Sequence, residues 1–122
     1  MGHAAMLVNE GFPDYLVKRL KDRFDLKSKV VGILGMAFKG ESDDQRDSLS
    51  IKLRKILQYE AKDVFVSDEY IEDPSFVTAF EVIKRSDIVV IGAPHKRYKN
   101  LNYKKVHLVD IWNMTQKGGY FL

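Results

Sequence analysis

Two segments of the sequence are almost continuously apolar and rich in β-branched residues, at residues 29–35 (KVVGILG) and 87–93 (DIVVIGA). Each has the length of a strand and is too short for a typical helix. A strand that is apolar on both faces is typical of the centre of a parallel sheet, because helices cover both sides of such a sheet. The chain is therefore predicted to form a mainly parallel sheet.

The rest of the sequence alternates predicted strands with predicted helices. Further strands are predicted at residues 62–67, 106–111 and, as a short edge strand, 120–122. One helix is predicted from Pro13 to about Asp25, and a second from a cap at Ser48 or Ser50 through Leu57. A third is predicted to start at Asp73-Pro74-Ser75, and its inward-facing residues would be Phe76, Val77, Phe80 and Ile83. Residues 98–105 are predicted to form a short helix or turn. Such alternation implies right-handed βαβ crossovers and an α/β fold.

Composition excludes several classes of protein. A length of 122 residues suits one domain, and the absence of cysteine excludes disulfides, thiolate metal sites and a cysteine nucleophile. The net charge is only +3, and charges of both signs are interspersed along the chain. Nucleic-acid binding is therefore the least favoured of the functions considered. No apolar run approaches the roughly 20 residues of a membrane span. We expect a cytoplasmic protein without a membrane or nucleic-acid partner. Met1-Gly2-His3 is interpreted as the start methionine followed by the remnant of a tag.

In a parallel α/β sheet, ligands bind beyond the carboxyl ends of the strands. The connections after Gly35, Val66, Ile91 and Val109 therefore matter most. The first of these is the richest, although its glycines match neither the dinucleotide fingerprint nor the P-loop. Its Lys39 and Arg46 suit a diphosphate, and Phe38 offers a stacking surface. A solvated polar loop with internal Asp–Arg pairs is the alternative that the residues leave open.

Other polar and aromatic residues have mainly structural interpretations. Asp43, Asp44 and Asp47 lack the rest of a calcium loop, so no metal site is predicted. Asp68 is expected to cap a turn, and His95 and His107 are expected to be hydrogen-bonded structural residues without a catalytic role. Trp112 is either a stacking platform or a core lid, and the basic residues among 96–105 are assigned to a solvated face.

The segment VGILGMAFKGESDDQRDS resembles the signature of the C-terminal, UDP-binding domain of the UDP-glucose/GDP-mannose dehydrogenase family. The matching residues are Gly35, Ala37-Phe38-Lys39, Asp43-Asp44, Arg46 and Ser48, and weaker likenesses lie at residues 86–91, at Asp110 and at residues 9–16. The resemblance implies a Rossmann-like, three-layer fold preceded by one helix of the family's central region. Residues 1–27 would be the tag remnant and the end of that region, and residues 28–122 the UDP-binding domain.

The resemblance also implies site residues. Phe38 and Lys39 would contact the nucleotide sugar, and Arg46 would contact the ligand or brace the loop. Further candidates are Gly35, Asp44, Ser48 and Trp112, with no catalytic residue in this chain. The sequence departs from the family pattern at Trp112, where many members carry an arginine, at Ser67-Asp68-Glu69 in place of Tyr-Asp-Pro, and at Glu60-Ala61 where a glycine is usual.

By the same resemblance, the parent enzyme would oxidise a UDP- or GDP-sugar to the uronic acid in two NAD-dependent steps, in polysaccharide biosynthesis. NAD and the catalytic cysteine would belong to other parts of that homo-oligomeric enzyme, so this chain alone would bind the nucleotide sugar without catalysis. The alternative is a stand-alone α/β interaction or regulatory module. A reading frame that continues upstream of Met1 into G-x-G-x-x-G and a cysteine-containing segment would favour the first interpretation.

Overall fold

A computed structural model describes residues 12–36, 49–93 and 95–111 of the chain. Its α-helices are α2 (Phe12–Arg23), α3 (Leu49–Glu60) and α4 (Ala79–Arg85), and its strands are β1 (Val30–Leu34), β2 (Asp63–Ser67), β3 (Ile88–Ile91) and β4 (His107–Asp110). Short 3₁₀ helices lie at Leu26–Ser28 and Lys96–Asn100. The predicted strand at residues 120–122 lies outside the described residues.

The four strands form one parallel sheet in the order β2-β1-β3-β4. Gly32 of β1 is in register with Phe65 of β2 on one side and with Val89 of β3 on the other. The chain therefore moves outward from β1 to β2 and then returns across β1 to β3. The order of the strands reverses at the carboxyl ends of β1 and β3, which is where open α/β sheets place their ligands.

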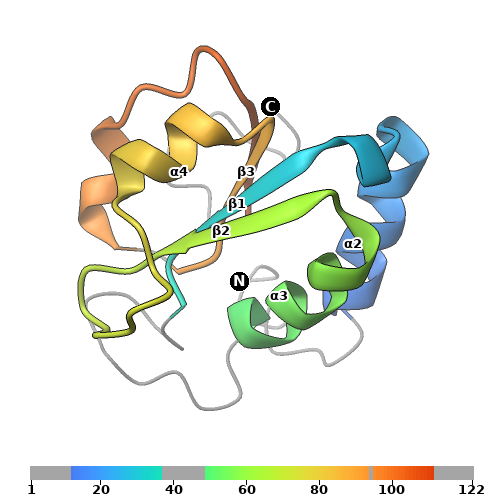
Figure 1. The fold of residues 1–122 in the computed structure, drawn as a ribbon. Coiled ribbons are helices and arrows are strands. Elements are labelled where there is room, and N and C mark those ends of the chain that lie inside the picture. Colours follow the sequence, from blue (N-terminus) through green and yellow to red (C-terminus); the bar gives the residue numbers. More distant parts are fainter. Residues whose placement is uncertain (1–11, 37–48, 94, 112–122) are drawn as a thin grey trace, which may run out of the picture.

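Helices cover both faces of the sheet, so the fold has the predicted three layers (Figure 1). On one face, α2 and α3 lie side by side and share a core with Val31, Ile33 and Val90. On the other face, α4 packs on β1 and β2, and Tyr98 joins its core with Leu34 and Val89. The α/β fold with a parallel sheet, predicted from the apolar runs, is confirmed, and so is the Rossmann-like arrangement that the resemblance implies.

The first described helix contributes fully to the core. Leu16 and Leu20 of α2 have no exposed surface, and Val17 is 4% exposed. These residues recur at helical spacing and face α3 and the sheet, while lysine and arginine side chains occupy the opposite face of the helix. The helix thus supplies part of the cover of the sheet. The domain boundary at residue 27 stays a prediction.

The predicted start of the helix before β3 is wrong. The helix α4 begins at Ala79, with Thr78 as its N-cap accepting a hydrogen bond from the Glu81 N–H, and Phe80 is 71% exposed instead of facing inward. Asp73 does not cap a helix: its carboxylate accepts hydrogen bonds from the N–H and the hydroxyl of Ser75 in a tight turn. The Val77 N–H then donates to the Val66 carbonyl, which holds the chain extended until Thr78.

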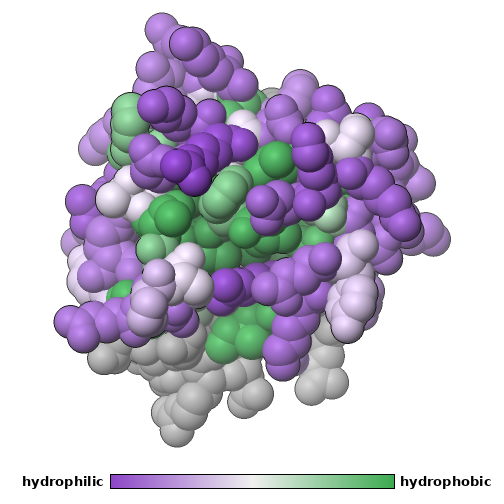
Figure 2. All heavy atoms as spheres, in the orientation of Figure 1, coloured by the Kyte–Doolittle hydropathy of each residue, from purple (hydrophilic) through white to green (hydrophobic). Residues whose placement is uncertain are grey.

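One strand at the edge of the described sheet is only partly covered. Val64 and Phe65 of β2 are half-buried, whereas β1 and β3 in the middle are almost entirely buried. Figure 2 shows the corresponding apolar band across the front of the molecule, bordered by hydrophilic residues above and below. The guanidinium group of Arg85 lies over the Phe65 ring, 5.6 Å from its centroid, and covers part of this band.

Candidate functional site

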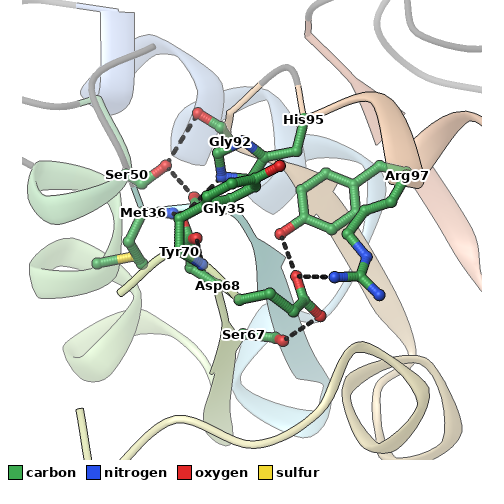
Figure 3. A network of polar contacts seen from close by, with 11 residues as sticks. Gly35, Met36, Ser50, Ser67, Asp68, Tyr70, Gly92, His95 and Arg97 are labelled. Atoms are coloured by element: carbon green, nitrogen blue, oxygen red, sulfur yellow. Dashed lines mark hydrogen bonds and ion pairs between the residues drawn. The ribbon is translucent and has the colours of Figure 1, made fainter. Parts of the chain in front are cut away.

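The carboxyl ends of β1, β2 and β3 meet at one edge of the sheet, and the residues that follow them are joined by hydrogen bonds (Figure 3). Gly35 and Met36 follow β1, Asp68 follows β2, and Gly92 and His95 follow β3. This is the edge that the alternating pattern indicated as the place for a ligand. Its described part combines backbone groups with the hydroxyl of Ser50, the carboxylate of Asp68 and the imidazole of His95.

Gly35 turns the chain away from the sheet as β1 ends. Its φ of +95° lies in the region that glycine adopts readily and other residues avoid. A Cβ atom at this position would lie 2.6 Å from the Ala93 Cβ and 2.8 Å from the Ala93 backbone nitrogen. Both the backbone conformation and the close approach of the neighbouring chain therefore require glycine here. Gly35, one of the predicted site residues, lies at the predicted edge and serves there as a turn.

Ser50 ties the exits of β1 and β3 to α3. Its hydroxyl, which is fully buried, lies 2.6 Å from the Gly35 carbonyl oxygen and 3.0 Å from the Gly92 carbonyl oxygen, so one hydrogen is shared between two acceptors (Figure 3). Ser50 is the second residue of α3 and is therefore not its N-cap. Ser48, the other cap predicted for this helix, lies outside the described residues.

Ser50→Ala is expected to lower the free energy of unfolding by about 1–3 kcal/mol, because two buried carbonyl groups lose their donor. Chemical denaturation of the variant and the parent chain would measure the loss. Ser75→Ala is the matched control, since the Ser75 hydroxyl is exposed to solvent and water replaces its bonds. Equal losses in the two variants would contradict a special role for the Ser50 hydroxyl.

Asp68 connects three segments through one carboxylate. Its Oδ2 atom accepts a hydrogen bond from the Met36 N–H at 2.8 Å and lies 3.0 Å from His95 Nε2, while Oδ1 accepts from the Tyr70 N–H at 2.8 Å. Burial alone would raise the pKa of Asp68, but the hydrogen bonds from His95, Met36 and Tyr70 outweigh this effect and lower the pKa below its ordinary value. The expected turn-capping role of Asp68 is confirmed by the Tyr70 contact.

His95 is enclosed by aromatic rings. Its side chain has no exposed surface, and its ring centroid lies 4.6 Å from that of Tyr70 and 5.3 Å from that of Tyr98. The Tyr98 hydroxyl donates to Glu69, which also lies 3.8 Å from the guanidinium of Arg97, and burial raises the pKa of Tyr98 well above its usual value. The interpretation of His95 as a hydrogen-bonded structural residue is confirmed.

His107, the other described histidine, lies at the opposite edge of the sheet. It begins β4 and is exposed, with its ring 4.9 Å from the Phe24 ring between centroids. A parallel strand begins at the edge opposite to the one where its neighbours end, so His107 is remote from the candidate site.

Two of the hollows formed by described residues adjoin the carboxyl edge, and their charges differ. A hollow of about 270 Å³ beside Met36 is lined by Met36, Ile51, Arg54, Lys55 and Gln58. A second, of about 450 Å³, is lined by residues between 67 and 78 that include the acidic residues Glu69, Glu72 and Asp73. An anionic ligand is attracted by Lys55 of the first hollow and repelled by the acidic residues of the second. The guanidinium of Arg54 donates to the Ser75 hydroxyl and lies over the Phe76 ring, so its charge is directed toward the acidic segment.

Most of the site residues predicted from the sequence lie outside the described residues. These are Phe38, Lys39, Asp44, Arg46, Ser48 and Trp112. Sequence reasoning missed the link between Asp68 and His95 and the double contact of Ser50. Asp68 was visible as a polar residue directly after a strand and Ser50 as a polar residue near the start of a helix, but their partners depend on which strands are neighbours. The described residues contain no group of three or more His, Asp or Glu side chains that could hold a metal.

The structure thus defines a Rossmann-like α/β domain with a polar, partly cationic edge at the point where the strand order reverses. Its sequence matches the UDP binding domain of the UDP-glucose/GDP-mannose dehydrogenase family over residues 32–117. That range includes most of the chain, and the chain belongs to this family. The resemblance seen in the residues after β1 is confirmed.

Several relatives show which part of the family's proteins this chain matches. A UDP-N-acetyl-D-mannosamine dehydrogenase of Methanocaldococcus jannaschii is 30% identical over 112 residues, covering 90% of this chain and 25% of that protein. A UDP-glucose 6-dehydrogenase of Haloferax volcanii is 44% identical over 61 residues, covering 50% of this chain and 14% of that protein. The chain therefore spans about a quarter or less of the length of these curated relatives.

Solved structures of the family share the fold. The UDP-D-ManNAc dehydrogenase of Pyrococcus horikoshii aligns with a TM-score of 0.78 and 24% identity, over 91% of this chain and 29% of that one. A UDP-glucose dehydrogenase of Pyrobaculum islandicum aligns with a TM-score of 0.72 and 27% identity, over 84% of this chain and 26% of that one.

The described residues do not fit the NAD that the family implies. In a dinucleotide-binding fold, an acidic residue after the second strand binds the ribose hydroxyls. Here Asp68 occupies that place, but its carboxylate is buried and already accepts hydrogen bonds from Met36 and Tyr70.

Within residues 12–36, 49–93 and 95–111, no helix has the length and apolar character needed to cross a bilayer.

Proposed function

We propose that this chain binds the nucleoside diphosphate part of a UDP- or GDP-sugar at the carboxyl edge of its sheet. The observation that carries the proposal is the family match over residues 32–117, which includes the whole connection from Gly35 to Ser48. Lys39 and Arg46 of that connection are the proposed diphosphate ligands, and Phe38 is the proposed contact to the nucleotide sugar. Asp44, Ser48 and Trp112 are further candidates.

The charge of the described hollows supports this assignment. The hollow beside Met36 carries Lys55, which adds positive potential on the side of β1 where α3 lies, while the Arg54 guanidinium in its wall is bonded to Ser75. The acidic hollow beside Asp68 repels anions. A diphosphate held by Lys39 and Arg46 would therefore be favoured on the α3 side of Met36.

We propose further that the parent protein is an NAD-dependent nucleotide-sugar 6-dehydrogenase that makes uronic acids, and that it works as a homo-oligomer. The relatives matched over about a quarter of their length are dehydrogenases of UDP-sugars. In this proposal the other parts of the parent supply NAD and the catalytic cysteine, which this sequence lacks. The chain alone then binds the nucleotide sugar and transfers no hydride.

UDP is expected to raise the melting temperature of the 122-residue chain, because a ligand that binds only the folded state stabilises it. Lys39→Ala is expected to weaken UDP binding by about 10- to 100-fold, which corresponds to one lost charge-assisted contact. Titration calorimetry and thermal unfolding with UDP and GDP would measure both effects. Lys62→Ala, the same change just before β2 at the opposite edge, is the matched control. A flat titration with millimolar UDP and GDP would contradict the proposal.

A further inference from the structure

The exits of three neighbouring strands are joined at a single buried oxygen atom. Oδ2 of Asp68, directly after β2, lies 2.8 Å from the Met36 nitrogen after β1 and 3.0 Å from the His95 Nε2 atom after β3 (Figure 3). The side chains of Asp68 and His95 have no exposed surface. A ligand at this edge therefore does not touch either side chain, and any effect they have on a ligand acts through the backbone that they hold.

The backbone group held by this pair is the one from which the connection to α3 starts. Gly35 turns the chain with its φ of +95°, and the next N–H, that of Met36, points to Asp68. Met36 also lines the cationic hollow. A change in the direction of the chain at Met36 shifts both the wall of that hollow and the start of the segment that carries Lys39 and Arg46.

We propose that Asp68 and His95 are positioning residues for nucleotide binding, which hold the exit of β1 through the Met36 N–H. This inference rests on the proposed function. The three donors from Met36, Tyr70 and His95 satisfy the buried carboxylate and partly offset its negative charge, which reduces its repulsion of an anionic ligand. Without the His95 donor, the carboxylate is drawn toward water, and Met36 loses its fixed acceptor.

Two His95 variants separate positioning from a general loss of stability. Leucine removes the donor, whereas glutamine keeps an N–H donor at a similar reach. We expect His95→Leu to weaken UDP binding by about tenfold and His95→Gln to bind within about threefold of the parent chain, both measured by calorimetry on folded protein at 25 °C. His107→Leu, at the opposite edge of the sheet, is the matched control and is expected to leave the affinity unchanged.

A second variant and a second measurement keep the test decisive if His95→Leu does not fold. Asp68→Glu keeps the charge but displaces the carboxylate by one methylene group, and it is expected to weaken UDP binding by about tenfold. The amide resonance of Met36 in ¹⁵N-edited NMR spectra reports its hydrogen bond directly. This resonance is expected to shift in Asp68→Glu and His95→Leu, and to stay near its original position in His95→Gln and His107→Leu.

The outcomes separate the two proposals. If the parent chain binds UDP and all variants bind it equally well, the positioning role is wrong and the proposed function stands. If the His95→Gln variant loses as much affinity as the His95→Leu variant, the positioning role is also wrong, because the donor does not matter. If the parent chain does not bind UDP or GDP, the proposed function fails, and the positioning role fails with it.

Discussion

Replacing Gly35 by alanine is expected to lower the free energy of unfolding by about 2–6 kcal/mol. A side chain at φ +95° costs about 1–3 kcal/mol in backbone strain. The new Cβ atom would lie 2.6 Å from the Ala93 Cβ, and relieving such a clash typically costs about 1–3 kcal/mol more. Domains of this size have about 5–15 kcal/mol of stability in total, so the substitution would remove a large fraction of it.

Thermal and chemical denaturation would measure this loss, and a second substitution tests its cause. Ala93→Gly removes the Cβ atom nearest to the new side chain, so the double variant is expected to regain part of the stability. It does not regain all of it, because the Ala93 nitrogen would still lie 2.8 Å from the new atom and the strained φ remains. A Gly35→Ala variant as stable as the parent chain would show that β1 does not leave the sheet in this way.

Asp68→Asn is expected to lower the free energy of unfolding by about 2–4 kcal/mol near neutral pH. An asparagine side chain has one acceptor oxygen, whereas the Asp68 carboxylate accepts from Met36 at one oxygen and from Tyr70 at the other. In one orientation the amide NH₂ group faces the buried Met36 N–H, and in the other it faces the partly buried Tyr70 N–H. Removing one partner of a buried polar network is costly because the other partners stay buried without their bonds.

The effect of Asp68→Asn is expected to depend on pH in one direction. The pKa of Asp68 is lower in the folded chain than its ordinary value of 3.8, so the ionised carboxylate stabilises the fold above about pH 4. This stabilisation is lost as the pH falls through the lowered pKa. The difference in unfolding free energy between the parent chain and the variant should therefore shrink below about pH 4.

Asp73→Asn is the matched control for this substitution. The Ser75 hydroxyl and then the Ser75 N–H lower the pKa of Asp73, but this residue is only partly buried and its bonds to Ser75 lie at the surface. Its replacement is expected to cost much less than that of Asp68, because water satisfies the groups that lose a bond. Denaturation curves of the three proteins between pH 3 and 7 would test this expectation. A constant difference between the parent chain and Asp68→Asn down to pH 3 would contradict the role given to the carboxylate.

The sheet could be predicted from the sequence because burial on both faces leaves a simple signal. The runs that became β1 and β3 are apolar at nearly every position, and only the middle of a parallel sheet buries such a strand completely. The start of α4 was mispredicted because Asp73-Pro74-Ser75 has the residues of a helix start. The choice between a cap and a tight turn depended on the Val77 contact to β2, which is distant in sequence.

The candidate site was predictable in kind but not in its contacts. Asp68 after a strand indicated a turn cap, and the Tyr70 N–H confirms that local role. The contacts of Asp68 to Met36 and His95 span 32 and 27 residues, and they follow from the sheet order β2-β1-β3. No local pattern contains that order. The roles of Phe38, Lys39 and Arg46 stay predictions, which the titrations above would test.

The packing of α2 has a consequence for movement in any longer protein that contains this domain. Leu16 and Leu20 are anchored in the same interior as Ile33 and Leu53, so the helix and the sheet travel as one rigid body. A swivel at residues 24–29 would have to pull those leucines into water. Opening and closing of the domain against a neighbour would therefore move α2 together with the sheet.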